Sequence, residues 1–226
     1  KTENPIASLI IPVFNEKDYI ERCIESVISS TEGIDNMELL LIDGGSTDGT
    51  QEIIKKFVAR YKFIKFFENE KKIIPTALNI GIRESSGKYI VRLDAHAVYY
   101  TGYVNKCIEV LENSDKEVAN VGGVIETKPS GKSFFVKTIA YVLSSKLGVG
   151  NSTFRVTVPS TPQFVETVPF GCYRREVFEE VGFFNESEHR NEDIEFNKRL
   201  ISSGKKVLLD PEIKSSYFSR KDLHSF

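Results

Sequence analysis

Apolar and polar positions alternate in blocks along the first half of the chain. Four runs of mostly apolar residues have the length and composition of buried strands: 8–14, 38–43, 63–67 and 88–93. Three segments between them show helical spacing or helix-end signals such as proline and glycine: 17–29, 50–60 and 75–87. This order of elements predicts an α/β fold of βα units, with a mostly parallel, Rossmann-like central sheet flanked by helices.

The second half of the chain is less regular. We expect three helices and two strands, at 101–112, 174–181, 191–203, 118–125 and 206–209. The segment from Ser144 to Gln163 is rich in Gly, Ser, Thr and Pro and has no sustained period. Loops of this length inside a compact domain usually serve as lids or binding loops, so we predict a lid here.

Composition excludes several classes of protein. The 226 residues are 40% apolar and carry 30 basic against 32 acidic side chains, which suits one α/β domain over 1–226. The formal net charge of −2 argues against broad electrostatic binding to nucleic acid. Three cysteines without a CxxC spacing predict neither a disulfide framework nor a zinc ribbon, and they favour a reducing cytoplasmic setting.

Two features of the whole sequence concern membranes and completeness. No run reaches the roughly 18 apolar residues that a transmembrane helix needs. The chain begins at Lys1, and its only methionine is Met37. We therefore expect a piece of a longer protein that does not itself cross a bilayer.

Candidate chemistry gathers where the predicted strands end, because ligands of open α/β sheets bind outside the carboxyl ends of the strands. Asp94 and His96 follow the run at 88–93, and residues i and i+2 of an extended chain point to the same side. A carboxylate oxygen and an imidazole nitrogen suit Mn²⁺ or another divalent ion, with a diphosphate in the remaining positions. The alternative is that Asp94 caps a following helix and His96 packs in the core.

Two further segments admit both a functional and a structural interpretation. Asp43 precedes Gly-Gly-Ser-Thr-Asp-Gly, which either lets the backbone approach a ligand or forms an ordinary turn. Asn-Glu-Asp at 191–193 opens a predicted helix, where the acids either complement the helix dipole or include a general base. The turn at 14–16 has no glycine, which argues against a dinucleotide-binding loop.

One motif is similar to the end of a phosphate-binding loop. Gly131-Lys132-Ser133 follows a predicted strand, but the full pattern requires glycine where Glu126 stands. A carboxylate at that position would repel a phosphate. Two rival classes stay open beside an enzyme acting at the strand ends: a phosphate-loop NTPase or kinase, and a non-catalytic module that binds a sugar or nucleotide.

Five motifs occur in the order that is typical of glycosyltransferase family 2, and the chain resembles that family on their account. They are Pro12-Val13-Phe14-Asn15-Glu16, the loop 43–50, the segment 77–81, Asp94-Ala95-His96 and Glu192-Asp193. Together they span nearly the whole chain. The Asp-Ala-His motif and the stretch 168–178 are similar to the branch that includes the succinoglycan-biosynthesis glucosyltransferases.

The resemblance implies the A-type glycosyltransferase fold, with a nucleotide-sugar-binding half at 1–100 and an acceptor-binding half at 101–226. It implies transfer with inversion from a nucleotide-diphosphate sugar, a UDP-sugar, to a hydroxyl of a saccharide or lipid-linked saccharide. Relatives often continue into membrane-spanning helices. A missing C-terminal segment would then hold this piece at the cytoplasmic face of the membrane.

The resemblance also implies residue roles through the matched positions. The donor would be contacted by Pro12, Phe14, Glu16, Asp43, Lys72 and Asp94. Mn²⁺ or Mg²⁺ would be held by Asp94 and His96, although the commoner motif of the family has a second Asp where this chain has the histidine. Asp193 would be the catalytic base.

Overall fold

The computed structural model describes residues 5–129, 159–188 and 191–218. The first half forms the predicted βα units: β1 (Ala7–Val13), α1 (Ile20–Ser30), β2 (Glu38–Asp43), α2 (Thr50–Arg60), β3 (Ile64–Glu68), α3 (Ile74–Glu84) and β4 (Tyr89–Arg92). A short 3₁₀ helix spans Ile34–Asn36. The α1 helix begins three residues later than predicted, because the amides of Tyr19 and Ile20 both bond to the Glu16 carbonyl in a turn that precedes it.

The second half departs more from prediction. It contains β5 (Ala97–Tyr99), α4 (Tyr103–Asn113), β6 (Val118–Lys128), β7 (Gln163–Phe164), β8 (Cys172–Arg174), α7 (Glu176–Glu180), α8 (Glu192–Ser202) and β9 (Lys206–Phe218). The strands β5, β7 and β8 are too short to leave a periodic signal. As a result, part of the predicted helix 174–181 belongs to β8.

The β9 strand has thirteen residues, whereas the sequence predicted a strand only at 206–209. Pro211 interrupts the apolar pattern, and the pairing with β6 shifts there from Gly122↔Leu209 to Val124↔Lys214. Gly123 allows β9 to approach β6 closely at this shift in pairing, because a Cβ at position 123 would lie 2.0 Å from the Ile213 carbonyl oxygen. Pairing with β5 and β6, rather than local sequence, extends the strand.

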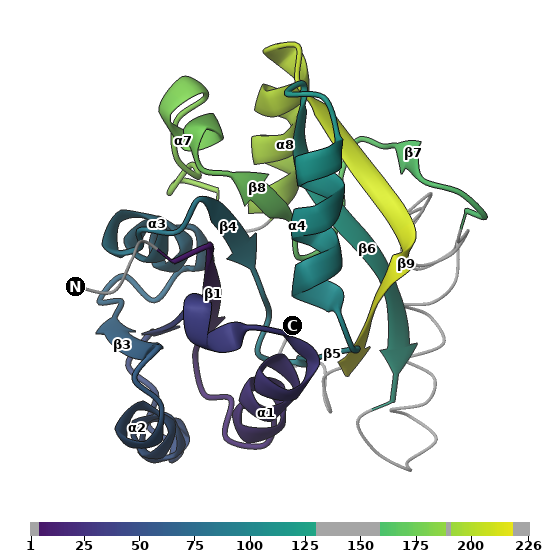
Figure 1. Ribbon diagram of the computed structural model, residues 1–226. Coiled ribbons are helices and arrows are strands. Elements are labelled where there is room, and N and C mark those ends of the chain that lie inside the picture. The colour runs from purple at the N-terminus through teal and green to yellow at the C-terminus, as the bar shows by residue number, and fades with distance from the viewer. Residues whose placement is uncertain (1–4, 130–158, 189–190, 219–226) are drawn as a thin grey trace.

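Within the described residues, nine strands form one mixed sheet in the order β3-β2-β1-β4-β8-β6-β9-β5, with β7 paired to β9 (Figure 1). The first four strands are parallel, and β8 is antiparallel to both β4 and β6. Because β6 thus runs with β4, and β9 runs parallel to β6, six strands point in one direction. The prediction of a mostly parallel α/β sheet is confirmed.

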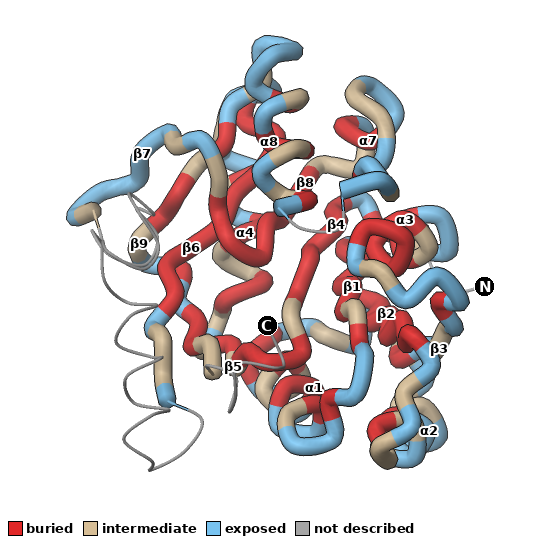
Figure 2. The backbone as a smooth tube through the Cα atoms, turned by 180° about the vertical axis from the view of Figure 1, so that it is seen from behind, coloured by how far each residue is buried: buried red, intermediate tan, exposed pale blue. Residues whose placement is uncertain are grey.

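Helices cover both faces of this sheet. One apolar cluster joins α1, α2 and α4 to the strands, and a second joins α3, α7 and α8 to the opposite face. Figure 2 shows the central strands as buried, whereas β7 and the outer sides of the helices are exposed. Since both faces of β1 and β2 are covered, these strands are continuous apolar runs with no polar alternation.

Three expectations from the sequence remain: the predicted lid, the motif similar to a phosphate-binding loop, and the absence of a membrane-spanning helix. Most of the predicted lid, 144–158, and the Gly131-Lys132-Ser133 motif lie outside the described residues. Within the described ranges, none of the helices has the length and apolar character needed to cross a membrane.

Candidate functional site

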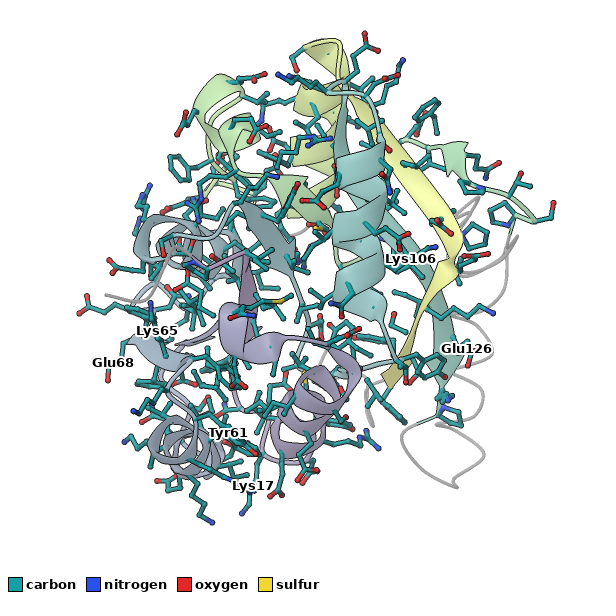
Figure 3. All side chains as sticks on the ribbon, viewed as in Figure 1. Lys17, Tyr61, Lys65, Glu68, Lys106 and Glu126 are labelled. Carbon is teal, nitrogen blue, oxygen red and sulfur yellow. The ribbon has the colours of Figure 1, made fainter. Side chains whose placement is uncertain are left out.

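Hydrogen bonds join the loop that follows β1 to the loop that follows β2. The Asn15 amide donates to Ser46 Oγ at 2.8 Å, and Asn15 Oδ1 accepts from the Thr47 amide at 2.9 Å. The Glu16 amide donates to Thr50 Oγ1, also at 2.8 Å. Lys17, labelled in Figure 3, extends the contact because its amide donates to Asp48 Oδ2 at 3.1 Å.

Asp43, the last residue of β2, holds the loop that follows β2 through hydrogen bonds to its side chain. Its side chain is fully buried, and Oδ2 accepts from the amides of Gly45 and Ser46, at 2.9 Å each, and from Gln51 Nε2 at 2.7 Å. Oδ1 accepts from the Ser46 hydroxyl. A carboxylate has about four acceptor positions. The donors of the loop and of Gln51 on α2 therefore use the acceptor capacity of Asp43. The structure therefore shows Asp43 bonded within its own loop.

A cavity of about 290 Å³ opens at the carboxyl ends of β1 and β4. Its walls come from the turn after β1, the loop after β2, the connection between β3 and α3, the segment after β4 and the end of β9. The lining residues are Pro12, Val13, Phe14, Glu16, Gly44, Asn69, Lys72, Ile73, Ile74, Ala77, Arg92, Leu93, Asp94, Ala95, His96 and Tyr217. This is where an open α/β sheet binds its ligand.

The cavity gathers most of the sequence-predicted site residues, namely Pro12, Phe14, Glu16, Lys72, Asp94 and His96. The other two, Asp43 and Asp193, are not among the described residues that line the cavity. Phe14 keeps 47% of its surface exposed, and the Lys72 Nζ lies 6.0 Å from the centre of its ring. An exposed aromatic face beside a cation can stack on a flat, electron-rich ligand ring.

Asp94 and His96 form a tight turn at the end of β4. Asp94 Oδ1 accepts the His96 amide at 2.8 Å, and the Asp94 amide donates to the Tyr99 hydroxyl oxygen at 2.7 Å. The short strand β5 follows, so the alternative that Asp94 caps a helix is wrong. Beneath the turn, burial and then the charge of Asp94 raise the pKa of the Cys23 thiol, which donates to the Asp94 carbonyl.

His96 also contacts Glu16, which lies in a different loop. The His96 Nδ1 lies 2.8 Å from Glu16 Oε2, and both side chains are 9% exposed. Within the described residues, no group of three or more His, Cys, Asp or Glu side chains is arranged to hold a metal. Asp94 and His96, the two metal ligands predicted from the sequence, both line the cavity.

Arg92, which the sequence analysis missed, joins the cavity to the start of α8. Its guanidinium pairs with Glu192 at 2.7 Å and with Asp193, and only 9% of its side chain is exposed. Asp193 Oδ1 is buried and has no hydrogen-bond partner among the described residues. An arginine inside the apolar run 88–93 was the available signal, because a buried charge requires a partner.

The start of α8 thus differs from a simple capped helix. Asn191 adopts a left-handed backbone with φ of 61° and makes no side-chain capping bond to the described residues. The two acids that follow are taken up by Arg92 on β4. The ion pairs hold Asp193 beside the cavity.

Comparison with known proteins establishes the family. Residues 8–182 match the family described as Glycosyl transferase family 2, and the chain belongs to glycosyltransferase family 2. It is 32% identical over 225 residues to the dolichyl N-acetyl-alpha-D-glucosaminyl phosphate 3-beta-D-2,3-diacetamido-2,3-dideoxy-beta-D-glucuronosyltransferase of Methanococcus voltae, covering 97% of this chain and 68% of that protein.

A second relative supports the predicted branch. The chain is 31% identical over 218 residues to the succinoglycan biosynthesis protein ExoA of Rhizobium meliloti, covering 95% of this chain and 64% of the relative. The chain therefore spans about two thirds of the length of these relatives.

The fold also matches solved glycosyltransferase structures. The mannosyltransferase PcManGT from Pyrobaculum calidifontis, in complex with GDP-Man and Mn²⁺, superimposes with a TM-score of 0.73. The match has 18% identity and covers 98% of this chain and 59% of that one. The predicted A-type glycosyltransferase fold is confirmed.

Proposed function

We propose that this chain is the catalytic domain of an inverting, metal-dependent glycosyltransferase. It transfers a sugar from a nucleotide-diphosphate sugar, a UDP-sugar, to a hydroxyl of a saccharide or lipid-linked saccharide. The observation that carries the proposal is the convergence of Phe14, Lys72, Asp94 and His96 on one cavity, with Asp193 held beside it by Arg92. The names of the relatives support a role in glycan biosynthesis and, for the acceptor, a saccharide carried on a lipid phosphate.

The charges around the cavity support the need for a cation. The cavity wall carries the carboxylates of Glu16 and Asp94 and the cations of Lys72 and Arg92. Arg92 is already paired with Glu192 and Asp193, so the two carboxylates of the wall outnumber the remaining cation, Lys72. A diphosphate entering this surplus of acids would be repelled. A divalent ion on the Asp94 carboxylate and the His96 imidazole would offset that repulsion, and both ligand types suit Mn²⁺.

The residues present therefore fit a metal. Asp94 and His96 would hold it, and the bound ion would neutralise charge on the departing diphosphate. Phe14 would stack on the nucleobase, while Lys72, whose Nζ lies 6.0 Å from the centre of the Phe14 ring, would contact the donor's negative charge. Asp43 would support the nucleoside site through the loop that it organises, which carries Gly44 to the cavity wall.

Asp193 is the proposed base. Arg92 fixes one of its oxygens, and Oδ1 is left as an acceptor for the proton of an attacking hydroxyl. The hydroxyl would attack the anomeric carbon from the face opposite the leaving diphosphate, which inverts the configuration without a covalent enzyme intermediate. Pairing with Arg92 orients the carboxylate before the acceptor arrives.

The test is a thermal-shift panel of UDP-sugars and GDP-sugars, each with and without Mn²⁺. A ligand at 100 times its dissociation constant stabilises the folded state by about 2.7 kcal/mol. We expect stabilisation by UDP-sugars that requires Mn²⁺, and no response to ATP. Stabilisation by ATP would favour the phosphate-loop NTPase instead, and donor binding without turnover on any saccharide acceptor would favour a non-catalytic module.

A further inference from the structure

The contact between Glu16 and His96 joins two loops at the centre of the cavity. Glu16 follows β1 and His96 follows β4, yet Oε2 of the first lies 2.8 Å from Nδ1 of the second. Both side chains are almost fully buried. At this ion-pair distance the negative charge of the carboxylate favours the proton on the nearer ring nitrogen, so Glu16 can decide which nitrogen carries it.

Other contacts fix the plane of the same imidazole. The Tyr19 ring stacks on it, with centroids 4.2 Å apart and an angle of 29° between the planes. Tyr217 lies 6.1 Å away, and the His96 amide is tied to Asp94 Oδ1. These contacts hold the ring in one orientation, with Nδ1 beside Glu16.

We propose that Glu16 is a positioning residue for His96, and that it acts through the imidazole rather than on the nucleoside. By accepting the Nδ1 proton, Glu16 holds His96 in the tautomer whose Nε2 is unprotonated, and presents that nitrogen to the divalent ion shared with Asp94. Histidines that bind metals commonly donate their other ring N–H to a carboxylate, which orients the ring and raises its basicity. The inference rests on the proposed function, because it requires that metal.

The first test reads the tautomer directly and needs neither metal nor activity. The chain has three histidines, so ¹⁵N spectra of labelled protein in alkaline buffer can be assigned with His96→Ala. We expect the wild type to show His96 protonated at Nδ1, and Glu16→Ala to lose that preference. An Nε2-protonated His96 in the wild type, or an unchanged tautomer in Glu16→Ala, would overturn the inference.

The second test measures Mn²⁺ affinity by water-proton relaxation in the presence of UDP. Glu16→Ala should weaken Mn²⁺ binding by about 10–100-fold, the usual effect of removing such a partner. Glu16→Gln keeps an oxygen that can accept the Nδ1 proton, so it should recover part of the affinity. Glu38→Gln is the matched control, since Glu38 is equally buried but bonds to Ser8, Ser86 and Lys65 outside the cavity.

The outcomes separate the inference from the proposed function. If the wild type binds Mn²⁺ and His96→Ala weakens it, but Glu16→Ala binds as tightly as the wild type, the inference fails while the proposed function stands. If the wild type binds no Mn²⁺ in the presence of UDP, the proposed function fails and the inference with it. Glu16→Gln, together with the melting temperature of each variant, separates a lost metal site from a lost fold.

Discussion

The paired loops after β1 and β2 and the start of α8 flank one cavity, but they are held in different ways. Four hydrogen bonds join the turn after β1 to the loop after β2 and the first residue of α2. Asp43 accepts three more from its own loop and one from Gln51 on α2. The start of α8 is tied to β4 through the single guanidinium of Arg92. Many hydrogen bonds therefore hold the donor side, whereas among the described residues the carboxylate of the proposed base forms its ion pair with one side chain, Arg92.

The largest effect should come from the base itself. Asp193→Asn keeps the shape of the side chain but removes its ability to take a proton, so transfer should fall by about 10²–10⁴-fold. Donor affinity should stay unchanged, because among the described residues Asp193 does not line the cavity. Steady-state kinetics at saturating donor measures the loss. Near-normal transfer by this variant would return Asp193 to the role of a helix-terminal acid.

The next effect tests the dependence on Arg92. Arg92→Met leaves the buried Glu192 and the partly buried Asp193 without their cation, which should cost about 3–5 kcal/mol in urea unfolding. Lys88→Met is the control, because its pair with Glu112 is largely exposed and should contribute about 0–1 kcal/mol. Equal losses in the two variants would contradict the account of Arg92.

The sequence predicted the first half of the fold well, and the reason lies in its local signals. Strands β1, β2 and β4 are largely apolar runs buried on both faces, and α2 lies at its predicted bounds. The long β9 could not be predicted, because Pro211 breaks its pattern and its polar end is held by pairing with β5 and β6. Such pairing depends on residues distant in sequence.

The candidate site shows the same division. Motif order led to Asp94, His96 and Phe14, which the fold brings to one cavity. The links between elements could not be predicted from motifs: Arg92 to Asp193, Glu16 to His96, and Tyr19 stacked on His96. Each of these contacts joins residues from separate βα units or from opposite halves of the chain, so no spacing rule along the sequence encodes it.

A smaller effect should follow from weakening the donor side. Asp43→Ala leaves the amides of Gly45 and Ser46 without their acceptor, and donor binding should weaken by about 1.5–3 kcal/mol. Asp43→Asn keeps an acceptor oxygen and should lose less. Isothermal titration with UDP and Mn²⁺ measures both variants. Unchanged UDP affinity in Asp43→Ala would restrict Asp43 to forming the turn.

The smallest effect concerns Glu186, which ties the segment before α8 to α3. Hydrogen bonds from Lys71 and then Asn79 lower the pKa of Glu186 from 4.5 to about 2. A depressed pKa contributes stability above about pH 4.5 that is lost as the pH falls toward 2. Lys71 is largely exposed, so solvent screening limits the contribution to about 1 kcal/mol.

Denaturant titrations of the wild type and Glu186→Gln across that pH range test this contribution. The wild type should be the more stable protein at neutral pH, and the difference should shrink between about pH 4.5 and 2. A difference that is constant with pH would show that the ionised carboxylate of Glu186 is not what stabilises this segment.

The most direct test of the central claim is the coupling between UDP and Mn²⁺ at the cavity. Titration calorimetry would give the UDP dissociation constant of the wild type, Asp94→Asn and His96→Ala, each with and without Mn²⁺. Mn²⁺ should tighten UDP binding to the wild type by about 5–150-fold, and UDP should tighten Mn²⁺ binding by the same factor. Both variants should bring that factor close to one. Equal UDP affinity of the wild type with and without Mn²⁺, or full coupling in Asp94→Asn, would contradict a metal-assisted donor site at the end of β4.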